Sequence, residues 1–145
     1  MSFATKIQAI FILALVGVLD ALYLTQGAFS KDGVVCLINE SCDVVTTSAY
    51  STWMGVPVVL VGLAFYLSVA VLSALVYYRK ISKSALLYLK IVTSIAIVVS
   101  LWFTYVQLFV LEAICEYCIL SAMLSVALFV LVWLKTGGVA ERESL

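Results

Sequence analysis

The sequence predicts an all-α membrane protein, a bundle of four transmembrane helices with a cysteine-bearing extracytoplasmic loop between helices 1 and 2. Of the 145 residues, 66% are hydrophobic and 11% are charged, whereas soluble domains are about half apolar and about a quarter charged. Four stretches are long and apolar enough to cross a hydrocarbon core as helices, which takes about 20 residues each. We therefore expect a single integral membrane domain over residues 1–145.

The predicted spans cover residues 7–29, 55–78, 85–111 and 115–133. Each is continuously apolar, whereas a membrane-spanning strand would alternate over about ten residues, so helices are expected. The second span opens with Gly55-Val56-Pro57, and a proline is tolerated there because the N–H that it lacks would be unpaired at a helix start. The tail over 136–145 is expected to be disordered.

Basic residues predict the orientation of the bundle. All eight except Lys31 fall before the first span, between the second and third, or after the fourth: Lys6, Arg79, Lys80, Lys83, Lys90, Lys135 and Arg142. By the positive-inside rule that face is cytoplasmic, so we expect a protein of the cytoplasmic membrane with both chain ends on the cytoplasmic side. The opposite face receives Asp32, Glu40, Asp43, Glu112 and Glu116. The formal net charge of +0 gives no argument for binding nucleic acid.

The chain has four cysteines and no histidine. Cys36 and Cys42 fall in the first loop, and Cys115 and Cys118 open the last span. An even number of crossings separates the pairs, so they share the extracytoplasmic face, where disulfides form and persist. Cys115 and Cys118 are neighbours on one helical face, close enough to bond. The helix macrodipole favours their thiolates, and the nearby Glu112 and Glu116 oppose this.

Several interpretations of these cysteines remain open at this point. A four-cysteine zinc site is conceivable, although such sites serve domains that cannot build a core. Two disulfides could staple a four-helix binding module without catalysis, but a C-x-x-C disulfide closes a very small loop and stabilises little. A small channel is a further alternative, although only Pro57 interrupts the helices. Dithiol redox chemistry explains the pattern best, and no metal site is expected.

A dithiol at a membrane needs an electron acceptor, and a lipid-soluble quinone is the natural one. Ser100, Thr104 and Gln107 follow at steps of four and three, so they form one polar stripe at the depth of Cys118. Hydrogen bonding between helices is the alternative explanation of this stripe. Asp20 lies roughly 13 Å below the outer boundary, where an ionisable group is costly and suggests a proton or quinone role. These residues are the predicted quinone-binding set.

The chain resembles the vitamin K epoxide reductase family, in particular its short prokaryotic members. The resemblance runs from the segment 17–25, GVLDALYLT, to Ser121 and includes the loop pair Cys36-x5-Cys42 with residues 43–48, the Trp53–Pro57 segment and Cys115-Glu116-Tyr117-Cys118. The rival is the bacterial disulfide-bond protein B type, whose C-x-x-C lies in the first loop. The order of the motifs here favours the reductase family.

The resemblance implies a helical bundle around a quinone of the ubiquinone, menaquinone or vitamin K type. Cys36 would exchange with a thioredoxin-fold partner, Cys42 would form a transient disulfide with Cys115, and Cys118 would reduce the quinone. Ser48 falls where the family has a hydroxyl that hydrogen-bonds in the active site; a helix-capping role is the alternative. The expected function is that of a quinone-linked thiol oxidoreductase that supports disulfide formation.

Two departures from the family pattern carry consequences. Ala122 stands where the animal enzymes have a tyrosine, so details of the animal reaction are not expected to transfer. The 145 residues end too soon for the thioredoxin domain that many bacterial relatives carry, so the expected partner is a separate protein.

Overall fold

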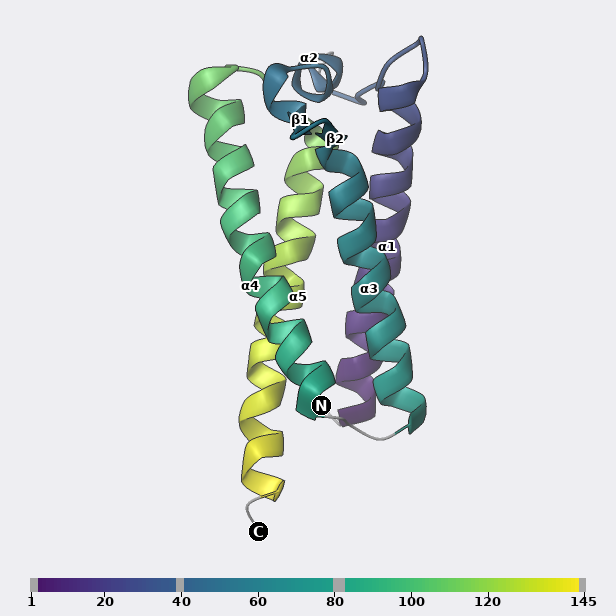
Figure 1. The fold of residues 1–145 in the computed structure, drawn as a ribbon, viewed down its shortest axis with the longest axis vertical. Helices are drawn as coiled ribbons and strands as arrows, with labels where there is room; N and C mark the ends of the chain where they lie inside the picture. Colours follow the sequence, from purple (N-terminus) through teal and green to yellow (C-terminus); the bar gives the residue numbers. More distant parts are fainter. Residues whose placement is uncertain (1–2, 39–40, 80–82, 144–145) are drawn as a thin grey trace.

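The computed structural model describes residues 3–38, 41–79 and 83–143. Among these residues, four helices are long and apolar enough to cross a membrane, which confirms the predicted all-α membrane bundle. They run side by side along the long axis, with both chain ends at the same end of the bundle (Figure 1). Their bounds are α1 Phe3–Phe29, α3 Val58–Arg79, α4 Lys83–Tyr105 and α5 Glu116–Glu143.

The helices carry apolar side chains outward as well as inward. Leu19, Val98 and Leu101, for example, are each about two-thirds exposed. In a bilayer this outward surface contacts acyl chains, while each helix pairs its own backbone N–H and C=O groups. The chain is therefore a multi-pass membrane protein.

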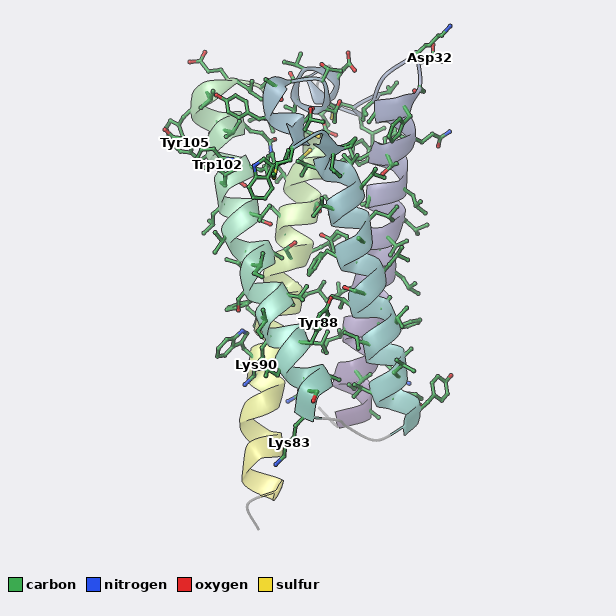
Figure 2. All side chains as sticks on the ribbon, in the orientation of Figure 1. Asp32, Lys83, Tyr88, Lys90, Trp102 and Tyr105 are labelled. Atoms are coloured by element: carbon green, nitrogen blue, oxygen red, sulfur yellow. A yellow bond between two sulfur atoms is a disulfide. The ribbon has the colours of Figure 1, made fainter. Side chains whose placement is uncertain are left out.

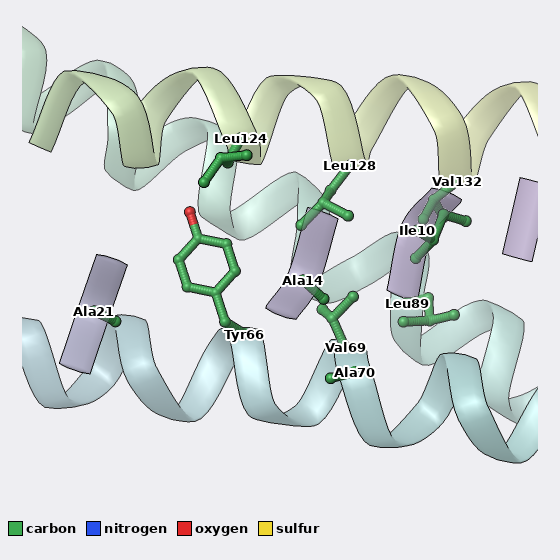
Figure 3. Packing of buried hydrophobic residues seen from close by; sticks show 10 residues of the cluster. All are labelled: Ile10, Ala14, Ala21, Tyr66, Val69, Ala70, Leu89, Leu124, Leu128 and Val132. Carbon is green, nitrogen blue, oxygen red and sulfur yellow. The ribbon is translucent and has the colours of Figure 1, made fainter. Parts of the chain in front are cut away.

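All four long helices contribute to a cluster of buried side chains in the middle of the bundle (Figure 3). Tyr66 of α3 is its largest member and donates a hydrogen bond to the carbonyl oxygen of Ser121 on α5, at 2.8 Å. A Cβ atom at Gly17 of α1 would collide with the Tyr66 ring, so this glycine makes room for it. Tyr66 thus bridges α3 and α5 beside a close contact with α1.

The segment between α1 and α3 folds over the end of the bundle opposite the chain ends (Figure 1). We call its described residues, 30–38 and 41–57, the cap. It contains the short helix α2 Cys42–Thr46, the 3-10 helix η1 Ala49–Ser51 and the antiparallel strands β1 Thr52–Trp53 and β2 Val56–Pro57.

The hairpin corrects the predicted start of the second span. Met54 and Gly55 have φ values of 52° and 84°, as the two central residues of a tight hairpin turn require. A positive φ cannot continue a right-handed helix. The helix α3 therefore begins at Val58 rather than at Gly55, and Pro57 ends β2.

Two helix ends also differ from the prediction. The ordinary helix α4 stops at Tyr105 and continues as the π-helix η2, Val106–Val110, whereas the predicted span ran unbroken over 85–111. The helix α5 extends to Glu143, beyond the predicted end of the last span at residue 133, and the expected disorder of the tail stays a prediction. Extending an existing helix adds one hydrogen bond per residue without a new nucleation step. Residues 144 and 145 lie outside the described part of the chain.

Charged side chains differ between the two ends of the bundle. Lys83 and Lys90 lie toward the end that holds the chain termini, and Asp32 projects from the cap (Figure 2). The structure describes Arg79, Lys135 and Arg142 by their backbone alone, and Lys80 and Glu40 lie outside the described residues. The cap is thus at the end of the bundle away from these two lysines.

Candidate active site

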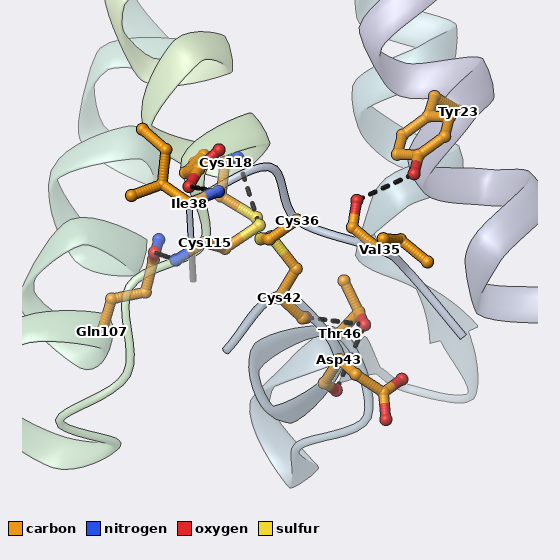
Figure 4. The surroundings of a disulfide bond; sticks show 11 residues. Tyr23, Val35, Cys36, Ile38, Cys42, Asp43, Thr46, Gln107, Cys115 and Cys118 are labelled. Carbon is orange, nitrogen blue, oxygen red and sulfur yellow. Dashed lines mark hydrogen bonds between the residues drawn. A yellow bond between two sulfur atoms is a disulfide. The ribbon is translucent and has the colours of Figure 1, made fainter. Parts of the chain in front are cut away.

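Cys36 and Cys42 form a disulfide within the cap, with their Cα atoms 5.7 Å apart (Figure 4). Cys42 is the first residue of α2 and is fully buried, while Cys36 is partly exposed. The hydroxyl of Thr46 donates a hydrogen bond to the carbonyl oxygen of Cys42 at 2.9 Å. One sulfur of this pair is therefore anchored and enclosed, and the other lies closer to solvent.

The irregular stretch that carries Cys36 is hydrogen-bonded to two helices. The hydroxyl of Tyr23 on α1 donates to the carbonyl oxygen of Val35 at 2.8 Å. The backbone N–H of Ile38 donates to the Glu116 carboxylate on α5 at 2.7 Å. The rings of Tyr23 and Tyr117 lie 4.7 Å apart and join the two fastening helices. These contacts hold Cys36 over the start of α5.

Cys115 and Cys118 are free thiols at the start of α5. Cys115 is fully buried, and its backbone N–H donates to the side-chain oxygen of Gln107 at 2.9 Å. The backbone N–H of Cys118 donates to the Cys115 sulfur at 3.3 Å. The hydrogen bond from the Cys118 thiol, together with those from the backbone N–H groups of Cys118 and Tyr117, lowers the pKa of Cys115, although burial opposes the effect. Cys115 is thus prepared to act as a thiolate.

The two pairs meet through their buried members. Cys42 and Cys115 belong to one buried cluster, against which Cys36 and Cys118 also pack. In Figure 4 the Cys115 side chain points toward the disulfide. The cluster thus brings together sulfurs from distant parts of the chain. Within the described residues, no group of three or more cysteine or acidic side chains is placed to hold a metal ion.

Below the cysteines lies a cavity of about 410 Å³, lined by all four long helices and by the cap. Most of its wall is apolar and comes from α3 and α4. All five residues predicted to bind a quinone contribute to this wall: Asp20, Ser100, Thr104, Gln107 and Cys118. The predicted polar stripe of α4 and η2 therefore faces this cavity together with Asp20 and Cys118, and quinone binding by these residues stays a prediction.

Gln107 also makes contacts at the cysteines that the sequence did not indicate. Its side-chain oxygen accepts the Cys115 N–H, and its backbone oxygen accepts the Ala113 N–H at 3.1 Å. Both bonds depend on η2, in which the Leu111 N–H bonds to the Val106 oxygen five residues earlier. π-Helical turns occur often at functional sites. Here the π-helical turn brings Gln107 into contact with Ala113 and Cys115, just before α5 begins.

Ser48, predicted to act in the active site, does not contribute to the cavity wall as found. Its hydroxyl donates to the carbonyl oxygen of Val45 at 2.8 Å, and it precedes η1 without capping that helix through its side chain. Ser51 lines the cavity instead, and its own hydroxyl donates to the Ser48 oxygen at 2.7 Å. Val45 lines the cavity as well, so Ser48 is bonded to two residues of the wall without lining it.

Sequence reasoning missed a group of hydroxyls in the wall. Ser121 and Ser125 follow Cys118 at steps of three and four along α5, and the hydroxyl of Tyr66 lies 2.8 Å and 3.3 Å from their hydroxyl oxygens. The helical spacing from Cys118 could have identified both serines. Tyr66 gave no such indication, because an aromatic residue in an apolar span is usually part of the core.

The fold and the site define a class of protein: an integral membrane protein with a disulfide and a dithiol side by side at the mouth of an apolar cavity. Residues 8–133 match the model of the Vitamin K epoxide reductase family, and the chain belongs to this family. Among curated proteins, none matches the chain. Members of the family are quinone-linked thiol oxidoreductases that usually work with a thioredoxin-like partner, so the chain is a membrane oxidoreductase.

The cavity is chemically suited to the quinone that the family uses. Its apolar wall matches an aromatic ring with a prenyl tail, and about 410 Å³ lies in the range of small-molecule sites. A quinone also needs polar groups for its two carbonyl oxygens. Asp20 supplies buried polar atoms, since neither carboxyl oxygen has a hydrogen-bond partner among the described residues. The residues present therefore fit the cofactor.

Proposed function

We propose that this protein passes electrons from a thioredoxin-fold partner through Cys36 and Cys42, then through Cys115 and Cys118, to a membrane quinone, and thereby supports disulfide formation. One observation carries the proposal. The two fully buried cysteines share a cluster, whereas Cys36 is partly exposed in the cap and Cys118 lines the cavity. Each pair therefore has one sulfur for the internal exchange and one for an outside reactant.

The first transfer consists of two thiolate attacks. A partner thiolate attacks Cys36, which forms a mixed disulfide and releases Cys42 as a thiolate. The partner's second thiolate then attacks its own sulfur in that bond and releases Cys36. The partner now holds a disulfide, and both loop cysteines are reduced.

The internal exchange repeats this chemistry inside the protein. Cys42 attacks a Cys115–Cys118 disulfide at Cys115, and Cys118 leaves as a thiolate. Cys36 then attacks Cys42 and releases Cys115. The disulfide in the structure corresponds to the stage that follows, because the loop pair is bonded and the helical pair is free.

Cys118 is the sulfur that lies at the cavity and would hand on the electrons. Asp20, Ser100 and Thr104 would hold a quinone headgroup, and apolar side chains of α3 and α4 would cover its ring and tail. When bound, a quinone supplies an acceptor for two electrons and two protons. Ubiquinone, menaquinone and a vitamin K-type quinone all meet this requirement; Ala122, in the wall, stands at the position of the animal tyrosine.

We place the cap outside the cytoplasmic membrane and both chain ends in the cytoplasm. Lys83 and Lys90 lie toward the end away from the cap, which supports this orientation by the positive-inside rule. An oxidising compartment also suits a cap that holds a disulfide. There Cys36 is open to a separate, soluble thioredoxin-fold protein.

The test is anaerobic mixing of the detergent-solubilised protein with a reduced thioredoxin-fold protein and ubiquinone carrying one isoprene unit, with quinol followed by absorbance. The wild type is expected to form quinol. Cys118→Ala should abolish quinol formation with any thiol donor. Cys36→Ala should block transfer from the protein donor and retain transfer from a small dithiol, which can reach the helical pair directly.

A disulfide-stapled binding module would behave differently. Replacing all four cysteines by serine would then lower stability and change nothing else. Quinol formation by this variant at the wild-type rate, or no quinol from the wild type with any of the three quinones, contradicts the proposal.

A further inference from the structure

Asp20 is a carboxyl group without a partner in the described part of the structure. It lies within the first membrane span, is 6% exposed, and both of its oxygens are buried. An unpaired carboxylate in such surroundings is costly, so the neutral acid is the stable form. Buried polar groups are normally hydrogen-bonded, and an exception of this kind requires an explanation.

The other buried polar side chains among the described residues all have partners. Three donate to a backbone oxygen in their own helix, and one accepts a backbone N–H: Ser73, Thr93, Ser125 and Gln107. Asp20 also lines the cavity, together with Cys118, but its carboxyl group has no hydrogen bond to any described residue. The comparison indicates that its partner is a molecule in the cavity.

Most hydroxyls of the wall already donate their protons elsewhere. Their acceptors are backbone carbonyl oxygens, and the donors are Thr46, Ser51, Tyr66, Ser68, Thr104 and Ser125. A quinone carbonyl oxygen is an acceptor and needs a donor. The carboxyl of Asp20 can supply one, because its proton is committed to no described residue.

We propose that Asp20 is the proton-transfer group of this cavity: its neutral carboxyl donates a hydrogen bond to a quinone carbonyl oxygen and gives up that proton as Cys115 and Cys118 form their disulfide. This inference rests on the proposed function. It assigns to one side chain a step that thiols and hydroxyls alone would otherwise perform.

The step balances without another reactant. Formation of the bond between Cys115 and Cys118 releases two electrons and two protons. Quinol formation consumes the same two electrons and two protons. Asp20 delivers one proton and is restored by a proton from one thiol, and the proton of the other thiol completes the quinol.

Infrared difference spectroscopy of the full-length protein tests the contact directly. Adding ubiquinone with one isoprene unit should shift the C=O stretching band of a protonated carboxyl group in the wild type. Asp20→Asn should lack this band, and Asp20→Glu, which keeps an acid, should retain it at a changed position. A band that does not respond to the quinone, or that persists in Asp20→Asn, overturns the inference.

Kinetics and stability provide a second measurement. Asp20→Asn is expected to slow quinol formation by about 10²-fold or more, as the loss of a general acid does. Exchange between the two cysteine pairs should keep its rate, and the unfolding temperature without quinone should not fall, because no described contact is lost. Asp32→Asn, an exposed acid of the cap, is the matched control and should change neither.

The outcomes separate the two proposals. If Asp20→Asn and Cys118→Ala both form quinol at the wild-type rate, neither the role of Asp20 nor the sulfur relay holds. Wild-type quinol formation by Asp20→Asn with Cys118→Ala inactive removes the role of Asp20 alone and leaves the relay in place.

Discussion

The two cysteine pairs have the same division of labour on very different backbones. In each pair one cysteine is fully buried, Cys42 or Cys115, and the other is partly exposed. The loop pair lies in the cap, an irregular segment with a five-residue helix. The helical pair opens α5, a helix of 28 residues that packs along α1 and α4. The two pairs can carry out the same thiol–disulfide chemistry, but one lies in an irregular segment and the other at the start of a long, packed helix.

This difference indicates which pair moves. Cys115 is held by the Gln107 side chain and by the start of a long packed helix. The stretch with Cys36 is tied to the bundle by the buried side chain of Val34 and by two single hydrogen bonds, and the side chains on either side of Cys36 are exposed. Segments with few buried contacts open at low free-energy cost. The stretch around Cys36 should therefore move toward a partner and return, while the helical pair stays at the cavity.

Internal exchange through the buried member of each pair requires that the sulfurs of Cys42 and Cys115 can bond to each other. The double variant Cys36→Ala/Cys118→Ala keeps only Cys42 and Cys115, and mild oxidation should link them completely, because they share one cluster. Peptide mass spectrometry after alkylation measures the bond. The control, Cys42→Ala/Cys115→Ala, keeps the two outer cysteines and should stay unlinked. Equal linkage in both variants, or none in the first, contradicts the shared cluster.

The pH dependence of exchange should differ from that of an ordinary thiol. The rate at which Cys115 attacks the loop disulfide follows its thiolate fraction, which falls below its pKa by about tenfold per pH unit. The hydrogen bond from Cys118 lowers the pKa of Cys115. As the pH is lowered, the exchange rate should therefore begin to fall only at a pH below about 8.5, the ordinary pKa of a cysteine thiol. Acid quenching and alkylation measure this rate.

Cys118→Ala supplies the control for this profile. It removes the largest cause of the lowered pKa, so the acid-side fall in rate should move to higher pH. An unchanged profile in the variant would show that the neighbouring thiol does not set the reactivity of Cys115.

The fixed setting of the helical pair should depend on Gln107. Gln107→Leu leaves the buried Cys115 N–H without its acceptor, which should lower the free energy of unfolding by about 1–3 kcal/mol. Denaturation in mixed detergent micelles measures the loss. Ser94→Ala, which removes a hydroxyl bonded within α4, should cost less. Equal losses would mean that the Gln107 side chain does not position Cys115.

The parts of the molecule predictable from sequence are those determined locally. Continuous apolar runs specify the four helices, because a bilayer forces each span to satisfy its own backbone. Helical periodicity also placed Ser100, Thr104 and Gln107 on one face, which lines the cavity.

The cap escaped prediction because its backbone depends on distant partners. The bond from Ile38 to Glu116 joins residues 78 positions apart, and no local pattern contains it. The hydroxyl of Ser48, expected at the chemistry, bonds Val45 of the cavity wall, a contact that the sequence did not indicate, and its role stays a prediction. The turn at Met54 uses a residue that seldom adopts positive φ, so the run after it was taken as the start of a helix.

The mobile setting of the loop pair should respond to Glu116. Glu116→Ala removes the acceptor for the Ile38 N–H, and amide exchange at Ile38 should speed up by as much as about tenfold, the effect of one hydrogen bond. Glu112→Ala removes a similar charge at the same end of the bundle and should leave Ile38 unchanged. Equal exchange in both variants would show that this bond does not hold the loop.

The smallest effect should come from the hairpin, which belongs to the cap but touches neither sulfur pair. Gly55 has φ of 84°, and a Cβ atom there would have no neighbour within 4 Å among the described atoms. Gly55→Ala therefore adds only backbone strain, about 1 kcal/mol, in thermal unfolding, and internal exchange should keep its rate. Gly17→Ala, which collides with Tyr66 in the bundle, should cost more. If Gly55→Ala instead slowed exchange, the hairpin and the Cys36 stretch would move as one unit, and the mobile element of the relay would be the whole cap.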